Sequence, residues 1–277
     1  MSKNLIKVNS DADIIEAQKN LEEPFVILVK DGNKLIYQDD SHCDAVILID
    51  DWNNYHAELP VVQRDISWIK GRRCLVKKTA DGVAICYLDE NNSELFHDGT
   101  TVAKLDGSMG QWMTDLPEFN IQCTEGESDW VKLHISKDRE IGHKSRRVLV
   151  GTVMATKRND QLWSSKYTLG TNSRLRPYTT TSNRDCHNEA TNLGEGFGII
   201  DYETHCKVAY MFMAKYKSKN PQEMEIFGTG SLNPTSTYVG NSTILGNTDG
   251  KYGDALNIMG IENWYSGTSE WLSGIHG

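Results

Sequence analysis

Two pairs of neighbouring cysteine and histidine residues could support metal binding or nucleophilic catalysis. Cys186 precedes His187, and His205 precedes Cys206. Thiolates and imidazoles are zinc ligands, and a cysteine beside a histidine can act as an activated nucleophile. Zinc sites normally separate their ligands by two or more residues, and helical neighbours point about 100° apart. We therefore expect these side chains to pack in the core, without metal and without catalysis.

A second run of potential ligands lies between residues 241 and 254. It is dense in side-chain oxygens, and Asn247 to Asp254 is the part that could hold calcium. The order of residues does not match an EF-hand loop, in which acidic residues precede a glycine and a distant glutamate. A series of solvated turns is the favoured interpretation, and calcium is the alternative.

The remaining sequence contains no recognisable catalytic motif. No glycine-rich phosphate loop follows a strand, and no GxSxG nucleophile motif occurs. We therefore expect a protein without enzymatic activity and without a bound cofactor.

The C-terminal segment combines large aromatic residues with carboxylates. Trp264 and Trp271 flank a glycine-containing turn, and Glu262 and Glu270 lie beside them. A buried indole needs a partner for its N–H, and a buried carboxylate must be hydrogen-bonded. This segment is therefore expected to be built into the core of the fold.

The first hundred residues are predicted to form a mostly β module. Hairpin turns are expected at Asp31-Gly32 and Asp81-Gly82, because apolar runs flank both pairs. A strand is expected at Ala45–Ile49, and a short helix is expected to begin at Ser10. Turn residues accumulate between residues 98 and 107, so we place a boundary between an N-terminal module, 1–105, and a second domain, 106–277.

The second domain is predicted to contain short strands, one main helix and long loops. Residues 131–136 alternate as a half-buried strand, and residues 148–153 are apolar enough for a central strand. Residues 159–192 lack periodicity and predict an ordered loop. A helix is predicted from Asp201, its N-cap, to Tyr216. Its expected buried stripe is Tyr202, Cys206, Ala209, Tyr210 and Met213.

Composition and charge exclude several classes of protein. The chain has 277 residues, 38% hydrophobic content and a formal net charge of −9. An acidic protein without a basic face does not suit nucleic-acid binding. No apolar window approaches a membrane span, and no secretory signal is visible at the N-terminus. We expect synthesis in the cytoplasm without membrane insertion.

Several ordered motifs resemble one family. Gly260-Ile-Glu-Asn-Trp264 followed by Glu270-Trp271 resembles the GIENxWG…EW signature of tail-fibre and receptor-binding proteins of gut bacteriophages. Those proteins are similar in turn to the C-type-lectin-like fold of formylglycine-generating enzyme. Of that enzyme's Gly-Asn-Val-Trp-Glu-Trp signature, the chain keeps the Glu-Trp half. Three further motifs fit the family pattern: residues 116–119, residues 196–204, and residues 220–230.

The resemblance implies an α+β fold in which a C-type-lectin-like domain follows the N-terminal β module. It implies a virion protein of a bacteriophage, made in the bacterial host cytoplasm, that binds a surface receptor or glycan as a homotrimer and contacts other virion proteins. Sugar rings stack on aromatic side chains in such sites, so the loop residues that we expect to bind are Trp163, Tyr167, Tyr178 and Tyr238. Family members usually continue beyond the Glu-Trp motif, so the chain is expected to be truncated before the usual receptor-binding segment or to display another surface. A purely structural fibre, head-decoration or tail-assembly subunit is the alternative.

Overall fold

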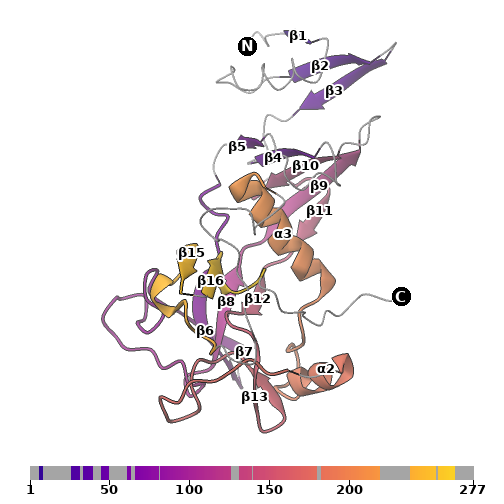
Figure 1. Ribbon diagram of the computed structural model, residues 1–277. Coiled ribbons are helices and arrows are strands. Elements are labelled where there is room, and N and C mark those ends of the chain that lie inside the picture. Colours follow the sequence, from indigo (N-terminus) through magenta and orange to yellow (C-terminus); the bar gives the residue numbers. More distant parts are fainter. Residues whose placement is uncertain are drawn as a thin grey trace. The chain divides into compact units, whose positions relative to one another are not determined.

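The computed structural model has a mixed α+β architecture of two described helices and small, mostly antiparallel sheets (Figure 1). The chain divides into two compact units, and each unit combines segments that are distant in sequence. The first unit comprises residues 1–69, 118–146 and 208–219, and the second comprises residues 70–117, 147–207 and 220–277. The structure describes residues 66–80, 82–125, 131–138, 140–179, 182–218, 238–253 and 255–265, and the strands at 6–8, 26–31, 34–39, 45–49 and 61–63.

The first unit contains two sheets. In the three-stranded sheet, β1 (Ile6–Val8) runs parallel to β2 (Val26–Asp31), and β2 pairs antiparallel with β3 (Lys34–Asp39). The five-stranded antiparallel sheet has the order β11-β9-β10-β4-β5. Its strands are β4 (Ala45–Ile49), β5 (Val61–Gln63), β9 (Phe119–Glu125), β10 (Val131–Ser136) and β11 (His143–Ser145). The predicted hairpin at residues 31–32 and the predicted strands at 45–49 and 131–136 are confirmed.

The second unit is built on a four-stranded antiparallel sheet with the order β12-β8-β6-β7. The strands are β6 (Arg72–Thr79), β7 (Gly82–Tyr87), β8 (Gln111–Leu116) and β12 (Val148–Gly151). The predicted hairpin between β6 and β7 is confirmed. This sheet joins strands from both sides of the boundary that the sequence suggests at residues 105 and 106, and the division into 1–105 and 106–277 stays a prediction.

The position of β12 differs from the prediction of a central strand. Among the described strands, it pairs only with β8 and therefore lies at an edge of its sheet. The chain at Glu262 covers the end of this strand, because the Glu262 N–H donates to the Thr152 carbonyl oxygen at 2.7 Å. An apolar sequence indicates that a strand is buried, but it does not show whether a neighbouring strand or another segment of the chain buries it.

Two smaller sheets in this unit end in tight turns. The hairpin of β13 (Thr156–Arg158) and β14 (Gln161–Trp163) turns at Asn159 and Asp160, which have φ values of 49° and 56°. The other sheet contains β15 (Gly250–Tyr252), β16 (Ala255–Ile258) and β17 (Ile261–Glu262), after the 3₁₀ turn η2 (Thr243–Leu245). Between β16 and β17, Met259 and Gly260 have φ values of 51° and 80°, as a two-residue hairpin turn requires.

The two described helices differ in how visible they are in the sequence. Helix α3 (Tyr202–Tyr216) begins as predicted, because the Asp201 carboxylate accepts the Thr204 N–H at 2.7 Å. Helix α2 (Asn183–Thr191) lies where a loop is predicted. Its buried side chains are only Glu189 and Ala190, so it has no apolar stripe for periodicity to detect. The helix predicted from Ser10 lies outside the described residues.

Of the predicted buried stripe of α3, only Met213 is buried, and the prediction is wrong for the other four residues. Tyr202 is 54% exposed, and Cys206, Ala209 and Tyr210 are half-buried. Residues 208–214 are all apolar or aromatic, so periodicity does not single out one face of this helix, and the predicted row is not the one that the fold buries. The buried residues of α3 are Thr204, Lys207, Val208, Met211, Phe212, Met213 and Ala214.

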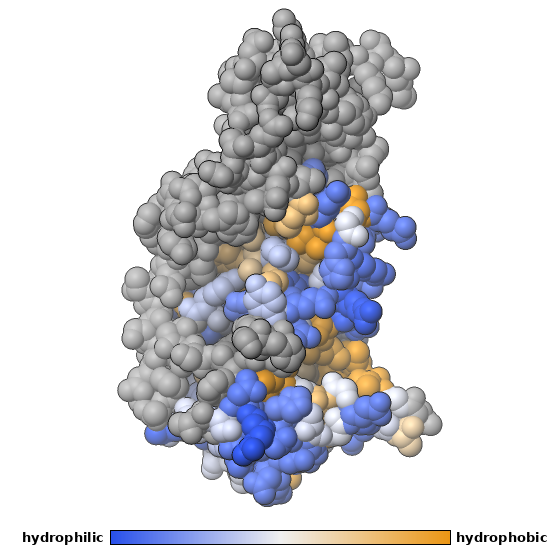
Figure 2. Space-filling model, turned by 90° about the vertical axis from the view of Figure 1, so that its right-hand side faces the viewer, coloured by the Kyte–Doolittle hydropathy of each residue, from blue (hydrophilic) through white to orange (hydrophobic). Residues whose placement is uncertain are grey.

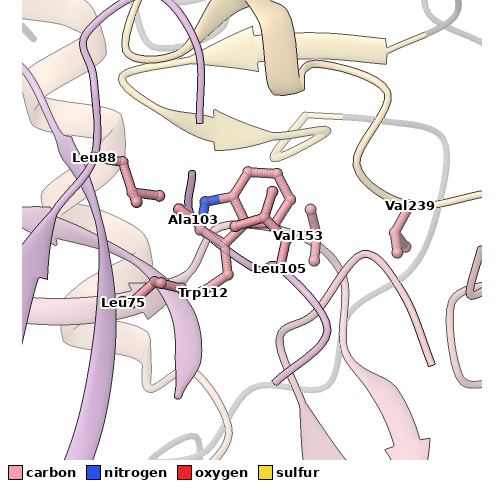
Figure 3. Close-up of a cluster of buried hydrophobic side chains, with 7 residues drawn as sticks. All are labelled: Leu75, Leu88, Ala103, Leu105, Trp112, Val153 and Val239. Atoms are coloured by element: carbon pink, nitrogen blue, oxygen red, sulfur yellow. The ribbon is translucent and has the colours of Figure 1, made fainter. Parts of the chain in front are cut away.

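The hydrophobic core of the second unit surrounds the indole of Trp112 on β8, which has no exposed surface (Figure 3). Around it lie side chains from β6, from the loops after β7 and β12, and from the chain before η2, namely Leu75, Leu88, Ala103, Leu105, Val153 and Val239. On the face shown in Figure 2, most of the described surface is hydrophilic, and the hydrophobic residues form separate patches. No helix in the described part of the chain is long and apolar enough to cross a membrane.

One close backbone approach fixes how the β16–β17 turn sits on β6. A Cβ atom added to Gly71 would lie 2.0 Å from the Met259 carbonyl oxygen and 2.5 Å from a methyl group of Thr114. Because the nearer contact is with backbone, a side chain here forces the turn away from the sheet.

We therefore expect Gly71→Ala to lower the free energy of unfolding by about 1–3 kcal/mol. The matched control is Gly198→Ala, because a Cβ atom at Gly198 meets nothing within 4 Å. Urea unfolding of both variants measures the difference. Equal stabilities of the two variants would show that the turn does not approach Gly71 as described.

Candidate functional site

The centre of the second unit is a fully buried arginine, Arg73 on β6. Its Nε donates to the Gly260 carbonyl oxygen at 2.8 Å. Nη1 donates to the Ser93 hydroxyl at 3.0 Å and to the Ser242 carbonyl oxygen at 2.9 Å. Nη2 donates to the Ser242 hydroxyl at 2.6 Å and to Asn257 Oδ1 at 3.0 Å. These five bonds use all five N–H groups of the guanidinium.

The negative charge that balances Arg73 is the buried carboxylate of Glu262, which is 3% exposed. Its two oxygens accept the N–H groups of Gly240 at 2.8 Å and Ser242 at 2.7 Å. Ser242 therefore bonds to both charges, through its N–H to Glu262 and through its carbonyl and hydroxyl to Arg73. Burial lowers the pKa of Arg73 to about 10, whereas the charge of Glu262 acts in the opposite direction. The guanidinium is cationic at neutral pH.

The rest of the Gly260-Ile-Glu-Asn-Trp264 segment is also held by specific bonds. The Gly260 carbonyl accepts a second donor, the Thr114 hydroxyl, at 2.8 Å. Asn263, with φ of 62°, accepts the Leu256 N–H at 2.8 Å through its side chain and donates its own N–H back to Leu256 at 2.7 Å. Asparagine tolerates this left-handed conformation better than most residues. The segment is thus an organising centre, which we call the 260–264 segment.

Trp264 ends this segment and is 6% exposed. Its ring stacks on His205 of α3, with ring centroids 5.7 Å apart and an interplanar angle of 25°. The indole N–H has no hydrogen-bond partner among the described residues, although the sequence leads us to expect one. Burial lowers the pKa of His205. Glu270 and Trp271 lie outside the described residues.

The four aromatic residues predicted to bind sugars each have a cation against the ring. Tyr238 is 41% exposed, and the other three are half-buried. The pairs are Arg158 with Trp163 at 3.8 Å, Lys166 with Tyr167 at 4.9 Å, Lys157 with Tyr178 at 5.1 Å, and Arg176 and Arg174 with Tyr238 at 5.0 and 5.4 Å. A sugar ring would compete with these cations for an aromatic face.

These four aromatics do not all converge on one site. Lys157 and Arg158 are neighbours on β13, and successive side chains of a strand point to opposite faces. Their aromatic partners, Tyr178 and Trp163, therefore lie on different sides of that hairpin. The Tyr167 hydroxyl donates to Glu94 at 3.1 Å, which ties this ring to the scaffold.

The cysteine–histidine pairs lie on the two helices. Cys186 is half-buried and His187 is exposed on α2, whereas His205 and Cys206 are half-buried on α3. The expected core burial is therefore wrong for His187, because the face of α2 that carries it points to solvent. Among the described residues, no three histidine, cysteine or acidic side chains are grouped so that they could hold a metal ion.

The oxygen-rich run from residue 246 onward is held by internal hydrogen bonds. Asn247 Oδ1 accepts the backbone N–H of Arg73 at 2.8 Å, and Asp249 Oδ1 accepts the backbone N–H of Met259. The Thr248 carbonyl accepts Asn257 Nδ2 at 2.7 Å. These oxygens accept hydrogen bonds that hold the fold together. Calcium binding by this run stays a prediction, and Asp254 lies outside the described residues.

One surface feature has no counterpart in the sequence prediction. An open depression of about 390 Å³ is lined by Arg72, Ile85, Cys86, Tyr87, Phe96, His97, Asp98 and Thr101. Its residues come from β6, from β7 and from the turn after β7. Strand β6 buries four consecutive residues, 73–76, so alternation along it does not mark Arg72 as the arginine that faces outward. The sequence also does not show that Phe96 and Asp98 fold back beside Tyr87.

Comparisons of the chain with protein-family models, with curated proteins and with solved structures found no match.

Removing the charge of Glu262 is expected to be costly. In Glu262→Gln, the new NH₂ group faces an N–H donor, and Arg73 stays buried without its counter-charge. We expect the free energy of unfolding to fall by about 3–5 kcal/mol, as when one member of a buried ion pair is removed. Guanidinium chloride unfolding provides the measurement.

The matched control is Glu118→Gln, because Glu118 forms an exposed pair with Lys144. This change is expected to alter stability by no more than about 0.5 kcal/mol. If Glu262→Gln proves as mild as the control, Glu262 does not neutralise a buried charge.

His205 is expected to make stability depend on pH. Its ordinary pKa of 6.5 is lowered in the folded chain, so the unfolded chain takes up a proton first as the pH falls. Stability is therefore lost as the pH falls through about 6.5. Between pH 7.5 and 5.5, His205→Phe should lose less stability than the unmodified chain, whereas His187→Phe, at an exposed position, should lose as much. Identical losses in both variants would contradict the assignment.

Proposed function

We propose that this chain is an adhesin-like tail or fibre component of a bacteriophage virion, with a C-type-lectin-like domain that binds a receptor or glycan on the bacterial surface. The observation that carries the proposal is the buried 260–264 segment. Its glycine, glutamate, asparagine and tryptophan resemble a phage receptor-binding signature, and each has a defined structural task.

The architecture supports a display role. Arg73 and the 260–264 segment hold loops that are distant in sequence, at Ser93 and in residues 240–247, by side-chain and backbone hydrogen bonds. Binding sites are commonly carried on loops that a rigid scaffold positions. In this proposal, the N-terminal β module attaches the chain to other virion proteins, and the assembled protein is a homotrimer without enzymatic activity.

A second candidate is a structural subunit of the fibre, head or tail that makes no receptor contact. The cations against Trp163, Tyr167, Tyr178 and Tyr238 favour it, because rings already covered by cations are less available for sugars. Under this alternative, the loops are buried against neighbouring virion proteins.

Antibody fragments raised against the purified chain distinguish the two candidates. For an adhesin, we expect gold-labelled fragments to mark the tail of purified phage particles and to slow adsorption of the particles to host cells. Labelling without any effect on adsorption would support the structural subunit. Particles that carry none of the chain would contradict both.

Light scattering of the purified chain tests the assembly separately. A homotrimer has about three times the 31.2 kDa mass of one chain. A mass equal to that of one chain at micromolar concentration would contradict the trimer.

A further inference from the structure

The open depression beside β7 combines features that the Arg73 centre does not use. Its volume of about 390 Å³ falls in the lower part of the range typical of small-molecule sites. Its lining brings together an arginine, a carboxylate, an imidazole and apolar side chains. The lining residues all belong to the second unit.

The arginine is Arg72, the neighbour of Arg73 on β6. Because successive residues of a strand face opposite sides, Arg73 points into the core and Arg72 points outward. The Arg72 guanidinium lies 3.9 Å from the centre of the Tyr87 ring. Its N–H groups make no hydrogen bond or ion pair within the described residues, so its planar fork is available to a ligand. Such a fork matches the two oxygens of a carboxylate.

Tyr87 fixes the position of this guanidinium. The Tyr87 hydroxyl donates to Asp115 Oδ2 at 2.6 Å, and Arg147 Nη2 donates to the same hydroxyl at 3.2 Å. Arg147 also donates to both oxygens of Asp115, at 2.8 and 2.7 Å. The ring on which Arg72 stacks is therefore held by a hydrogen-bonded network. Ordering a side chain before binding reduces the entropy that binding must overcome.

The same lining offers acceptors and apolar contact. The Asp98 carboxylate accepts the Thr101 hydroxyl and the N–H groups of Thr100 and Thr101, and these bonds lower the pKa of Asp98 to about 2. An exposed anionic carboxylate of this kind can accept sugar hydroxyls. Phe96 and Ile85 add apolar surface, which suits the carbon face of a sugar ring.

We propose that this depression binds a monosaccharide unit that carries a carboxylate, as uronic and sialic acids do. The carboxylate pairs with the Arg72 fork, ring hydroxyls donate to Asp98, and the carbon face of the ring lies on Phe96. A small inorganic anion would meet the repulsion of Asp98 and gain nothing from the apolar lining. In taking a glycan as the ligand class, this inference rests on the proposed function.

The test is a titration of the purified chain in which binding is monitored by saturation-transfer NMR of the ligand. The probes are methyl β-D-glucuronide and the methyl glycoside of N-acetylneuraminic acid, with methyl β-D-glucoside and acetate as comparisons. We expect one or both acidic sugars to bind at least tenfold more tightly than the uncharged sugar and acetate. Which acidic sugar binds distinguishes a uronate from a sialate.

Arg72→Ala should weaken that binding by about tenfold or more, because a hydrogen-bonded charge pair is lost. Arg72→Lys keeps the charge but lacks the planar fork, so its affinity for the acidic sugar should lie between those of the unmodified chain and Arg72→Ala. The matched control is Arg184→Ala, which removes an exposed arginine from α2 and should leave binding unchanged. Thermal unfolding of each variant verifies that it is folded.

Several results would overturn the inference. They are equal binding of the charged and uncharged sugars, binding of acetate as tight as that of the acidic sugars, equal losses in Arg72→Ala and Arg184→Ala, or no binding by any probe. Because this test uses the isolated chain, its outcome is separate from that of the particle experiments. If the chain binds acidic sugars but is missing from particles, the proposed sugar site stands and the proposed phage role is contradicted. If the chain is found in particles but binds no acidic sugar, only the proposed sugar site is contradicted.

Discussion

The buried guanidinium of Arg73 is the constraint on which the second unit depends. Removing an arginine from water costs several kcal/mol unless hydrogen bonds and an opposite charge replace the lost solvation. Here, four residues from three parts of the chain supply the acceptors, namely Ser93, Ser242, and Asn257 and Gly260 of the β16–β17 hairpin. Any rearrangement of these loops leaves a buried N–H without a partner. The cost of that loss specifies one arrangement for loops that contain little regular secondary structure.

The same arginine separates the polar centre from the hydrophobic core. The indole of Trp112 faces aliphatic side chains on one part of its surface (Figure 3). On another part it faces a cation, because the Arg73 guanidinium carbon lies 5.1 Å from the centre of its ring. Strand β6 thus carries Arg73 inward, where it organises the fold, and Arg72 outward, where the ring of Tyr87 holds it in place. Because Arg72 and Arg73 are consecutive residues, the buried Arg73 centre directly adjoins the surface that we propose to bind an acidic sugar.

The elements with strong local signals could be predicted from the sequence, and the others could not. The predicted hairpins at Asp31-Gly32 and Asp81-Gly82 and the predicted N-cap at Asp201 depend on local chemistry. The strand pairings β2–β3 and β6–β7 and the Asp201 cap are found. Helix α2 leaves no such signal in the sequence, because it buries almost no apolar side chain. The buried partner of Glu262 could not be found either, since Arg73 is 189 residues away in sequence and an arginine in a strand is usually exposed. Contacts of this range depend on tertiary folding and leave no local periodicity.

Hydrogen exchange of individual backbone amides tests the central claim most directly. The amides of Gly240 and Ser242 donate to Glu262, and the amide of Leu256 donates to Asn263. These three amides should therefore exchange as slowly as those in the paired strands β6 and β8. Rapid exchange of the three amides while β6 and β8 stay protected would contradict a buried Arg73–Glu262 centre that holds the loops.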